Sequence, residues 1–393
     1  MNKKILNTDV QNFIFDNLNS NIHSLILRGS PFKQLDIKEI TIQIQAKKKC
    51  ELKLKTWYSA SNIYYPNKLN IEQTSSESTA KIKSSLISGD SLVDLSGGFG
   101  VDSYYFSRQF KAVTHCEINA ELAEIAAHNF SVLKADNIIN KAMDGLEFLS
   151  SCDNTFDWIY IDPSRRDAKK RKKFLIEDCS PNIVELQNSI FKYSNNVLIK
   201  LSPMLDISSS LKTLKQIRNI YIIAVKNEVK ELLFHQEKDF DSAPCIHTIN
   251  SKSSETERFS FEMQSEKNAE ATFGSLKTYL YEPNAAVLKS GAFKLISEQF
   301  NLEKLDLHTH LYTSELKSVD FPGKIYKISN VFPYHKKTLK QNIGGSKANV
   351  KTRNFPEKTD ALKKQFNLSD GGDSFLFFTS CQKEKLLIQC KLA

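Results

Sequence analysis

Residues 91–103 read SLVDLSGGFGVDS, an apolar strand that runs into a glycine-rich turn and then into a helix. Such a turn lets backbone N–H groups and the N-terminus of the helix approach a ligand closely. Gly98 and Gly100 alone are weak evidence, because nicotinamide and flavin proteins and ordinary tight turns use similar glycines. Two details narrow the choice: Asp94 stands where a dinucleotide-binding strand has an apolar residue, and Ser103 replaces the third glycine. A carboxylate at position 94 can hold water or the ammonium group of a methionine moiety.

Acidic residues also follow the next two strands. Glu117 ends the strand AVTHCE (112–117), a position from which an acid accepts hydrogen bonds from both hydroxyls of a ribose. It could equally be a helix-capping acid before Asn119. Asp144 follows the third strand, where an acid accepts from an adenine amino group while Met143 packs on the ring. Asp144 could also be only the N-cap of the helix that begins GLEFL.

A fourth strand, Phe156 to Ile161, delivers the motif Asp162-Pro163-Ser164-Arg165-Arg166 to the carboxyl edge of the sheet. Open α/β sheets bind their ligands at this edge. Proline fixes the backbone, so Asp162 or its neighbouring carbonyl can be aimed at a reacting group. We therefore expect Asp162 and Pro163 in a catalytic centre. Acids at four successive strand ends are hard to collect by accident, and together they indicate one ligand site.

Strand-like and helical stretches alternate from Ser91 to about Gln264, which predicts an α/β fold with a mostly parallel sheet covered on both faces. Residues 1–90 form a mainly helical extension, in which ITIQIQ (40–45) and CELKLKTW (50–57) alternate like strands. The polar stretch 265–275 has the composition of a linker. A small α+β region follows it.

The order of these motifs resembles the class I S-adenosylmethionine-dependent methyltransferases over roughly residues 73–264. The resemblance implies a Rossmann-like domain over residues 91–264 with S-adenosyl-L-methionine as the cofactor. It places ribose at Glu117 and adenine at Asp144, and Asp162 is a further cofactor contact. At the methionine end it places Asp94, Ser96, Gly98 and Gly100.

More narrowly, DLSGGFGVDS, IDPSRR and YEPNAAVLKSGAF are similar to a bacterial group of methyltransferases that carry ferredoxin-like and THUMP-like domains at the C-terminus. This resemblance implies a ferredoxin-like unit at 276–325 and a THUMP-like domain at 326–393. THUMP domains are RNA-binding units of tRNA-modifying enzymes. The implied substrate is therefore RNA, either tRNA or rRNA.

The acceptor atom stays open. Amino-group methyltransferases usually have an aromatic residue fourth in an Asp/Asn-Pro-Pro-aromatic motif, where this chain has Arg165. Uridine C5 enzymes need a cysteine nucleophile after the next strand, where this chain has Lys200-Leu201-Ser202-Pro203. Lys200 is a further catalytic candidate, because a lysine can lower the pKa of a hydroxyl group. Ribose 2′-O-methyltransferases use a Lys-Asp-Lys-Glu set, for which the candidates are Lys83 (or Lys81), Asp162, Lys200 and Glu228.

Basic residues are clustered within the formal net charge of +9. A loop directly after the Asp-Pro motif is a candidate for RNA phosphate contacts, although most charge runs are solvated surface loops. Its substrate-binding candidates are Arg165, Arg166, Lys169, Lys170 and Arg171. A second cluster in the tail, interleaved with Tyr334 and Phe355, comprises Lys336, Lys337, Lys340, Lys347, Lys351, Arg353 and Lys358.

Several classes of protein are disfavoured. The seven cysteines include no Cys-x-x-Cys pair, and His308 and His310 have no partner pattern, so we expect neither disulfides nor a metal. No apolar run is long enough for a membrane span, and the first residues lack the apolar core of a signal peptide, so we expect a cytoplasmic protein. The alternatives are an RNA-binding protein whose methyltransferase fold no longer turns over, and a nicotinamide-dependent oxidoreductase.

Overall fold

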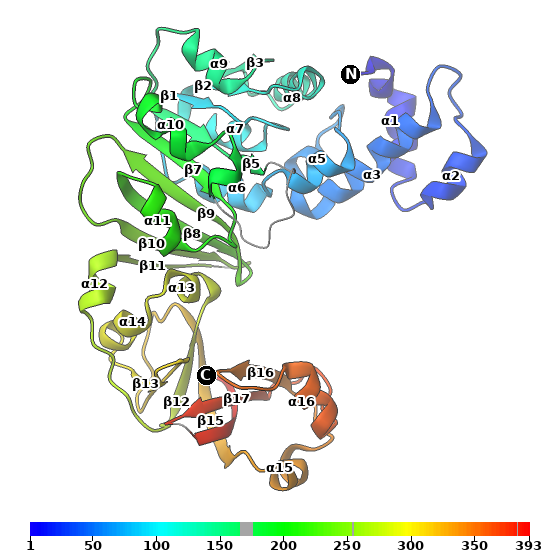
Figure 1. The fold of residues 1–393 in the computed structure, drawn as a ribbon. Coiled ribbons are helices and arrows are strands. Elements are labelled where there is room, and N and C mark those ends of the chain that lie inside the picture. Colours follow the sequence, from blue (N-terminus) through cyan, green and yellow to red (C-terminus); the bar gives the residue numbers. More distant parts are fainter. Residues whose placement is uncertain (166–175, 254, 383) are drawn as a thin grey trace. The chain divides into compact units, whose positions relative to one another are not determined.

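The α/β part of the chain is built on a nine-stranded sheet, in the order β11-β10-β8-β9-β7-β4-β1-β2-β3 (Figure 1). Strands β3, β2, β1, β4 and β7 run parallel, and β9 runs antiparallel to β7. The mixed α/β fold with a large, mostly parallel sheet is thus confirmed. The strands are β1 (Gly89–Asp94), β2 (Phe110–Cys116), β3 (Ile138–Lys141), β4 (Trp158–Ile161), β7 (Asn196–Leu201), β8 (Ile217–Val225), β9 (Glu228–Glu237), β10 (Cys245–Ser251) and β11 (Thr256–Glu262).

This computed structural model describes residues 1–165, 176–253, 255–382 and 384–393. The chain divides into two units by its contacts. The first consists of Met1–Asn219 and Lys230–Ser242, and the second of Ile220–Val229 and Ala243–Ala393.

The order of the parallel strands reverses at β1. Strand β2 pairs with one side of β1 and β4 with the other, so that Asp94 lies opposite both His115 and Tyr160. The carboxyl ends of β1 and β4 then diverge into loops that leave a crevice between them, which is where open α/β sheets bind ligands. The helices that connect these strands within the described residues are α7 (Val101–Phe106), α8 (Ala120–Val132), α9 (Gly145–Ser150), α10 (Ile183–Ile190) and α11 (Ile207–Thr213).

Residues 1–86 contain helices but no strand among the described residues, so the two strands expected at 40–45 and 50–57 are wrong. The alternating pattern would bury Ile42 and Leu52, yet both are exposed. A helical face buries Ile40, Ile44 and Cys50 instead, because these positions recur at the helical period. The helices are α1 (Thr8–Asp16), α2 (Ile22–Arg28), α3 (Ile37–Lys53), α4 (Lys55–Ser59), α5 (Lys68–Gln73) and α6 (Glu77–Ser84), after a short 3₁₀ turn.

The N-terminal helices pack directly on the helix that follows the glycine turn. Trp57 is fully buried, and its ring meets Tyr104 of α7 edge-on at a centroid distance of 4.9 Å. Lys53 donates to the carbonyls of Ile71 and Glu72 at 2.8 Å each, and so fixes the last turn of α5. The extension is therefore part of the core that supports the crevice.

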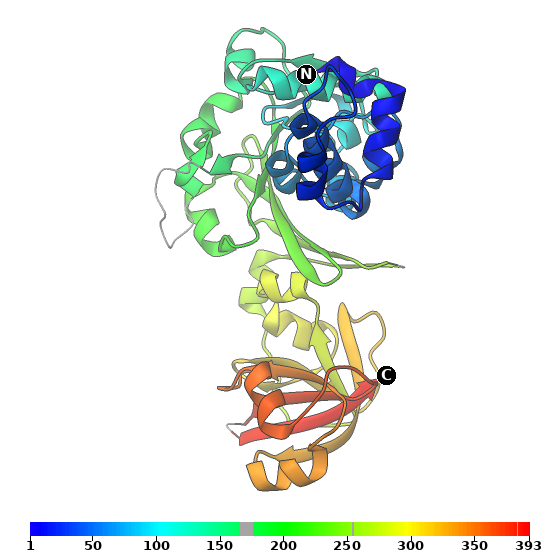
Figure 2. The same cartoon turned by 90° about the vertical axis from the view of Figure 1, so that its right-hand side faces the viewer.

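The second unit contains a seven-stranded sheet in the order β13-β14-β12-β15-β18-β17-β16. Helices α15 (Lys336–Ile343) and α16 (Thr359–Phe366), orange in Figure 2, cover one face through Leu339, Leu362 and Phe366. No helix in the described ranges is both long and apolar enough to span a membrane. The strands are β12 (Tyr279–Pro283), β13 (Glu303–Asp306), β14 (Thr309–Ser314), β15 (Gly323–Pro333), β16 (Asn349–Arg353), β17 (Phe375–Cys381) and β18 (Glu384–Leu392).

Candidate active site

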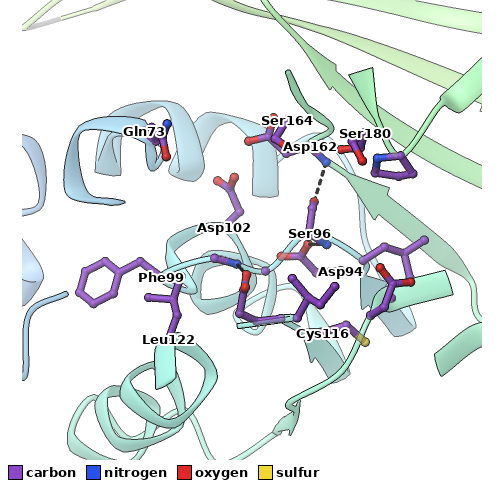
Figure 3. A pocket seen from close by; sticks show the side chains of 18 of the residues that line it. Gln73, Asp94, Ser96, Phe99, Asp102, Cys116, Leu122, Asp162, Ser164 and Ser180 are labelled. Atoms are coloured by element: carbon purple, nitrogen blue, oxygen red, sulfur yellow. Dashed lines mark hydrogen bonds between the residues drawn. The ribbon is translucent and has the colours of Figure 1, made fainter. Parts of the chain in front are cut away.

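A cavity of about 620 Å³ lies at the carboxyl ends of β1, β2 and β4 (Figure 3). No lysine or arginine lines it among the residues that the structure describes. Its acidic lining residues are Asp94, Asp102, Glu117, Asp144, Asp162 and Glu185. Because opposite charges attract strongly in a partly desolvated crevice, this lining favours a cationic ligand.

Glycines shape the floor of the cavity. Gly98 and Gly100 have positive φ angles of 56° and 83°, which residues other than glycine rarely adopt. A Cβ atom on Gly97 would lie 2.1 Å from the ring of His115. Gly97 and Gly98 line the cavity, whereas Gly100 does not and serves as the N-cap of α7.

Asp94 is almost fully buried at the end of β1. It accepts hydrogen bonds from Ser103 Oγ at 2.6 Å and from the Ser96 N–H at 3.0 Å. Burial raises the pKa of Asp94 to about 7, although these two donors act in the opposite direction. Ser103 also contacts His115 Nδ1 at 3.0 Å, and burial lowers the pKa of His115 to about 3. Asp94 is thus a carboxyl group whose charge a cationic ligand would stabilise.

Glu117 and Asp144 line the cavity at the next strand ends. Glu117 accepts from the Gly98 N–H at 2.9 Å through one oxygen and from the Asn119 N–H at 2.8 Å through the other. Asp144 is the N-cap of α9 and accepts from the Leu146 N–H at 2.8 Å. The capping interpretation of Asp144 therefore holds, and its carboxylate still borders the cavity. Met143 is not among the lining residues.

Asp162 is fixed from two sides. Its N–H donates to Ser96 Oγ at 2.6 Å, which ties the end of β4 to the turn after β1 (Figure 3). Its carboxylate forms an ion pair with Lys200 of β7. Ser164 lines the cavity, whereas Pro163, between Asp162 and Ser164, is not among the lining residues. Arg165 lies in β5 (Ser164–Arg165), while Arg166, Lys169, Lys170 and Arg171 lie outside the described residues.

A cluster of buried charged side chains lies next to the cavity. Lys83 is completely buried and donates to Asp102 at 3.0 Å and to Tyr160 Oη at 2.9 Å. It also pairs with Glu231 at 3.4 Å. Glu228, the glutamate expected in the Lys-Asp-Lys-Glu set, is exposed at the start of β9, and Glu231 takes the expected place beside the lysine. Lys81 pairs with Glu77 instead.

Two walls of the cavity, from α5 and from residues 180–186, and two of its acids, Asp102 and Glu185, were not predicted from the sequence. Asn70, Gln73 and Thr74, from the end of α5, line the cavity from the N-terminal extension. Asp102, in the first turn of α7, accepts from Ser75, Lys83 and Tyr160 through one oxygen, while its other oxygen is buried without a partner among the described residues. The signal for Asp102 was present, because it belongs to the quoted motif DLSGGFGVDS. Gln73 and Thr74 lie at the start of the stretch that carries the resemblance, whereas nothing in the sequence pattern pointed to Asn70.

The C-terminal part of the chain matches two known domain families. Residues 279–322 match the model of a ferredoxin-like domain, and residues 323–392 match a model described as THUMP domain-like. None of the curated proteins matches the sequence.

The whole chain is similar to the crystal structure of a proposed methyltransferase from Porphyromonas gingivalis W83. The two are 29% identical with a TM-score of 0.90, and the match covers 100% of this chain and 98% of the other. A proposed methyltransferase, yhhF, from Escherichia coli is 17% identical (42% of this chain, 85% of the other, TM-score 0.31). TrmK from M. capricolum, solved with S-adenosyl-homocysteine, is 18% identical (41% and 68%, TM-score 0.32). The expected resemblance is confirmed: the chain has the α/β fold of a class I methyltransferase, followed by a ferredoxin-like and a THUMP-like domain.

Proposed function

We propose that this protein is an S-adenosylmethionine-dependent methyltransferase that modifies RNA. The acidic cavity at the switch point of the sheet is the observation that carries the proposal. S-adenosylmethionine bears a positive sulfonium and an ammonium group, both of which carboxylates attract. A nicotinamide dinucleotide would bring two phosphates to six acidic side chains, which makes the oxidoreductase alternative unfavourable.

Each lining residue then has a distinct task. Asp94 and the Ser96–Gly98 turn hold the methionine end, Glu117 accepts from the ribose hydroxyls, and Asp144 faces the adenine. When bound, the cofactor supplies an electrophilic methyl group. The protein positions the acceptor in line with that methyl group, for which Asp162 is the best placed side chain.

Isothermal titration with S-adenosylmethionine, S-adenosylhomocysteine and NADH tests the cofactor. Micromolar affinity for the first two ligands and no response to NADH are expected. Asp94→Asn should weaken binding on the order of tenfold or more, because it removes a buried charge from the ligand's cationic end. Asp90→Asn, on the exposed start of β1, is the matched control and should bind like the wild type. Absence of binding by the wild type would leave the non-catalytic RNA-binding alternative.

RNA as the substrate rests on the THUMP-like match and on the basic residues of the tail. Lys351 and Arg353 of β16 are engaged with Glu282, so they are less suited to phosphates than the sequence suggests. Lys336, Lys337 and Lys340, on α15, are exposed and remain the stronger candidates. A cytoplasmic location accords with this substrate.

Binding of bulk tRNA, measured over a range of salt concentrations, tests the RNA assignment. Changing Lys336, Lys337 and Lys340 together to glutamate should weaken binding and reduce the slope of log affinity against log salt by about 2 to 3. The double change Lys33→Glu and Lys38→Glu, on the exposed surface of the N-terminal extension, is the control. Equal losses in both variants would contradict a role for α15.

A further inference from the structure

Five ionisable side chains from five different elements meet next to the cavity. They are held by three ion pairs: Lys83 with Asp102 at 3.0 Å, Lys83 with Glu231 at 3.4 Å, and Lys200 with Asp162. We call these five residues the charge cluster. They come from α6, from α7, from the residue directly after β4, and from β7 and β9, so the cluster joins neighbouring strands of the sheet to two helices.

The exposure of the charge cluster rises toward the cavity. The side chain of Lys83 is 0% exposed and that of Glu231 is 3%, whereas Lys200 and Asp162 are 18% and 30% exposed. Lys83 and Glu231 thus cannot reach a substrate. Asp162 lines the cavity, and Lys200 lies directly behind it in the ion pair, so these two residues form the end of the cluster nearest to an incoming acceptor.

The surrounding acids keep Lys200 protonated. Burial alone would lower the pKa of Lys200, but Asp162, Glu231 and Asp102 raise it above its ordinary value. A fixed cation therefore stands beside the carboxylate of Asp162. Together they offer one hydrogen-bond donor with a full positive charge and one proton acceptor.

The described residues that line the cavity near Asp162 include no aromatic side chain. Ser164 and Ser180 lie beside Asp162 in Figure 3, and Pro181, Asn182 and Leu186 continue the lining after Ser180. Among the described lining residues Phe99 is the only aromatic one, and it lies well apart from Ser164 and Ser180 in Figure 3. A nucleobase turned out of its stack is normally held between aromatic or apolar side chains. The described wall offers a base no ring to stack on beside Asp162, whereas the carboxylate and the serine hydroxyls suit a small polar acceptor group.

We infer that the methyl acceptor is a hydroxyl group, which within an RNA chain is the ribose 2′-hydroxyl, with Asp162 and Lys200 as its catalytic pair and Lys83 and Glu231 as positioning residues. This inference rests on the proposed function. The hydroxyl oxygen forms a bond to the methyl carbon of S-adenosylmethionine as the methyl–sulfur bond breaks. The electron pair of that bond stays on sulfur, which becomes a neutral thioether, and the hydroxyl proton passes to the carboxylate of Asp162. Lys200 stabilises the negative charge that develops on the oxygen.

Alkaline digestion of labelled product distinguishes the acceptor. RNA from cells that lack the protein is incubated with the enzyme and S-adenosylmethionine that carries a tritiated methyl group. A 2′-O-methyl group blocks alkaline cleavage at its own nucleotide, so the label should appear in dinucleotides. Label in mononucleotides would overturn the inference while the proposed function stands. If no label enters the RNA while the protein still binds S-adenosylhomocysteine, RNA is not the substrate. The inference about the ribose hydroxyl then fails as well.

Variants of the charge cluster test the assigned roles. Asp162→Asn and Lys200→Gln should lower kcat on the order of 100-fold or more, with affinity for S-adenosylhomocysteine within about threefold of the wild type. The rate of Asp162→Asn should also rise with pH, by up to about tenfold per unit, because hydroxide must then take the proton. Glu231→Gln should lower kcat with little change in KM, while Glu237→Gln, isosteric and on the same strand, should leave both unchanged. A pH profile of Asp162→Asn like that of the wild type would contradict its role as proton acceptor.

Discussion

Buried charges gather at two places in this molecule, one in each unit, and they are neutralised to different degrees. In the second unit, Glu282 of β12 is the single carboxylate of its cluster, and it is met by Lys351, Arg353 and the hydroxyl of Tyr326. Lys351 also lies over the rings of Tyr326 and Phe377. In the first unit, the charge cluster sets three carboxylates against two lysines and borders a cavity that adds further acids.

The difference in neutralisation indicates which of the two clusters is suited to a ligand. Two cations and the Tyr326 hydroxyl meet the one carboxylate of Glu282, and the cations extend toward solvent, so the charge is neutralised and the cluster can serve the fold alone. Among the described residues its one buried polar atom without a partner is Arg353 Nε, which belongs to a cation that is already paired. In the charge cluster one oxygen of Asp102 and one of Glu231 are buried without a partner among the described residues. Burial also raises the pKa of Glu231, although Lys83 and Lys200 oppose it. An excess of buried acid beside an open cavity is costly to the fold, and a cationic ligand would offset that cost.

Removal of the central residue of each cluster should produce the largest contrast. Lys83→Met leaves Asp102 and Glu231 buried without their cation, so we expect a loss of about 4 kcal/mol in the free energy of unfolding. Glu282→Gln leaves two partly exposed cations that water can still solvate, and we expect a loss of about 2 kcal/mol. Calorimetric unfolding of both variants measures the contrast. Equal losses would show that the two clusters are equivalent in the fold.

A methyl group at the floor of the cavity should have the next largest effect. Gly97→Ala places a Cβ atom 2.1 Å from the buried ring of His115, which has no room to move, so we expect a loss of about 3 kcal/mol and weaker cofactor binding. Gly291→Ala, in the second unit, is the control. Its φ is +79°, but nothing lies within 4 Å of the added atom, so about 1 kcal/mol is expected. Similar losses in the free energy of unfolding for the two variants would mean that the His115 ring can move to make room for the added methyl group.

The fold of the first unit was predictable where strand and helix patterns agreed with a buried sheet. The alternation from β1 to β7 is such a case, because fully covered strands and their connecting helices leave continuous apolar runs. The expected strands at 40–45 and 50–57 failed because the residues at alternate positions also fall partly on one face of a helix. Tertiary packing favours the helices, as in the contact of Trp57 with Tyr104 of α7, and such contacts are not local in sequence.

The candidate site was predictable to the extent that its residues stand at strand ends. Asp94, Glu117, Asp144 and Asp162 all line one cavity, since parallel strands deliver their carboxyl ends to the same edge. The contribution of α5 through Asn70 could not be foreseen, because the docking of this helix depends on Lys53 and on tertiary packing. Glu231 was not predicted: it is buried beside Lys83, whereas Glu228, the glutamate chosen from the sequence, is exposed at the start of β9. The two lie three residues apart on a strand and therefore face opposite sides of the sheet.

Glu117 offers a smaller test of the acidic cavity. Glu117→Gln keeps the shape but replaces a charged acceptor of the ribose hydroxyls with a neutral one, so we expect affinity for S-adenosylhomocysteine to fall about tenfold. Glu121→Gln, exposed in the first turn of α8, is the control and should bind normally. Isothermal titration measures both. Equal affinities of the two variants for S-adenosylhomocysteine would contradict a contact between Glu117 and the ribose hydroxyls.

The smallest effect expected is a pH dependence that comes from Asp94. Its pKa of about 7 in the folded protein exceeds the ordinary value of 3.8, so the folded state holds a proton that the unfolded chain has lost between about pH 4 and 7. The contribution of this group to stability therefore falls as pH rises through that window. A cationic ligand favours the ionised carboxylate, and affinity for S-adenosylmethionine should rise about threefold from about pH 6.5 to 7.5. His115, Asp102 and Asp162 also lie near this carboxyl group, so the comparison with Asp94→Asn is essential: the variant should lose the pH dependence, and a dependence that survives would assign it to one of these neighbours.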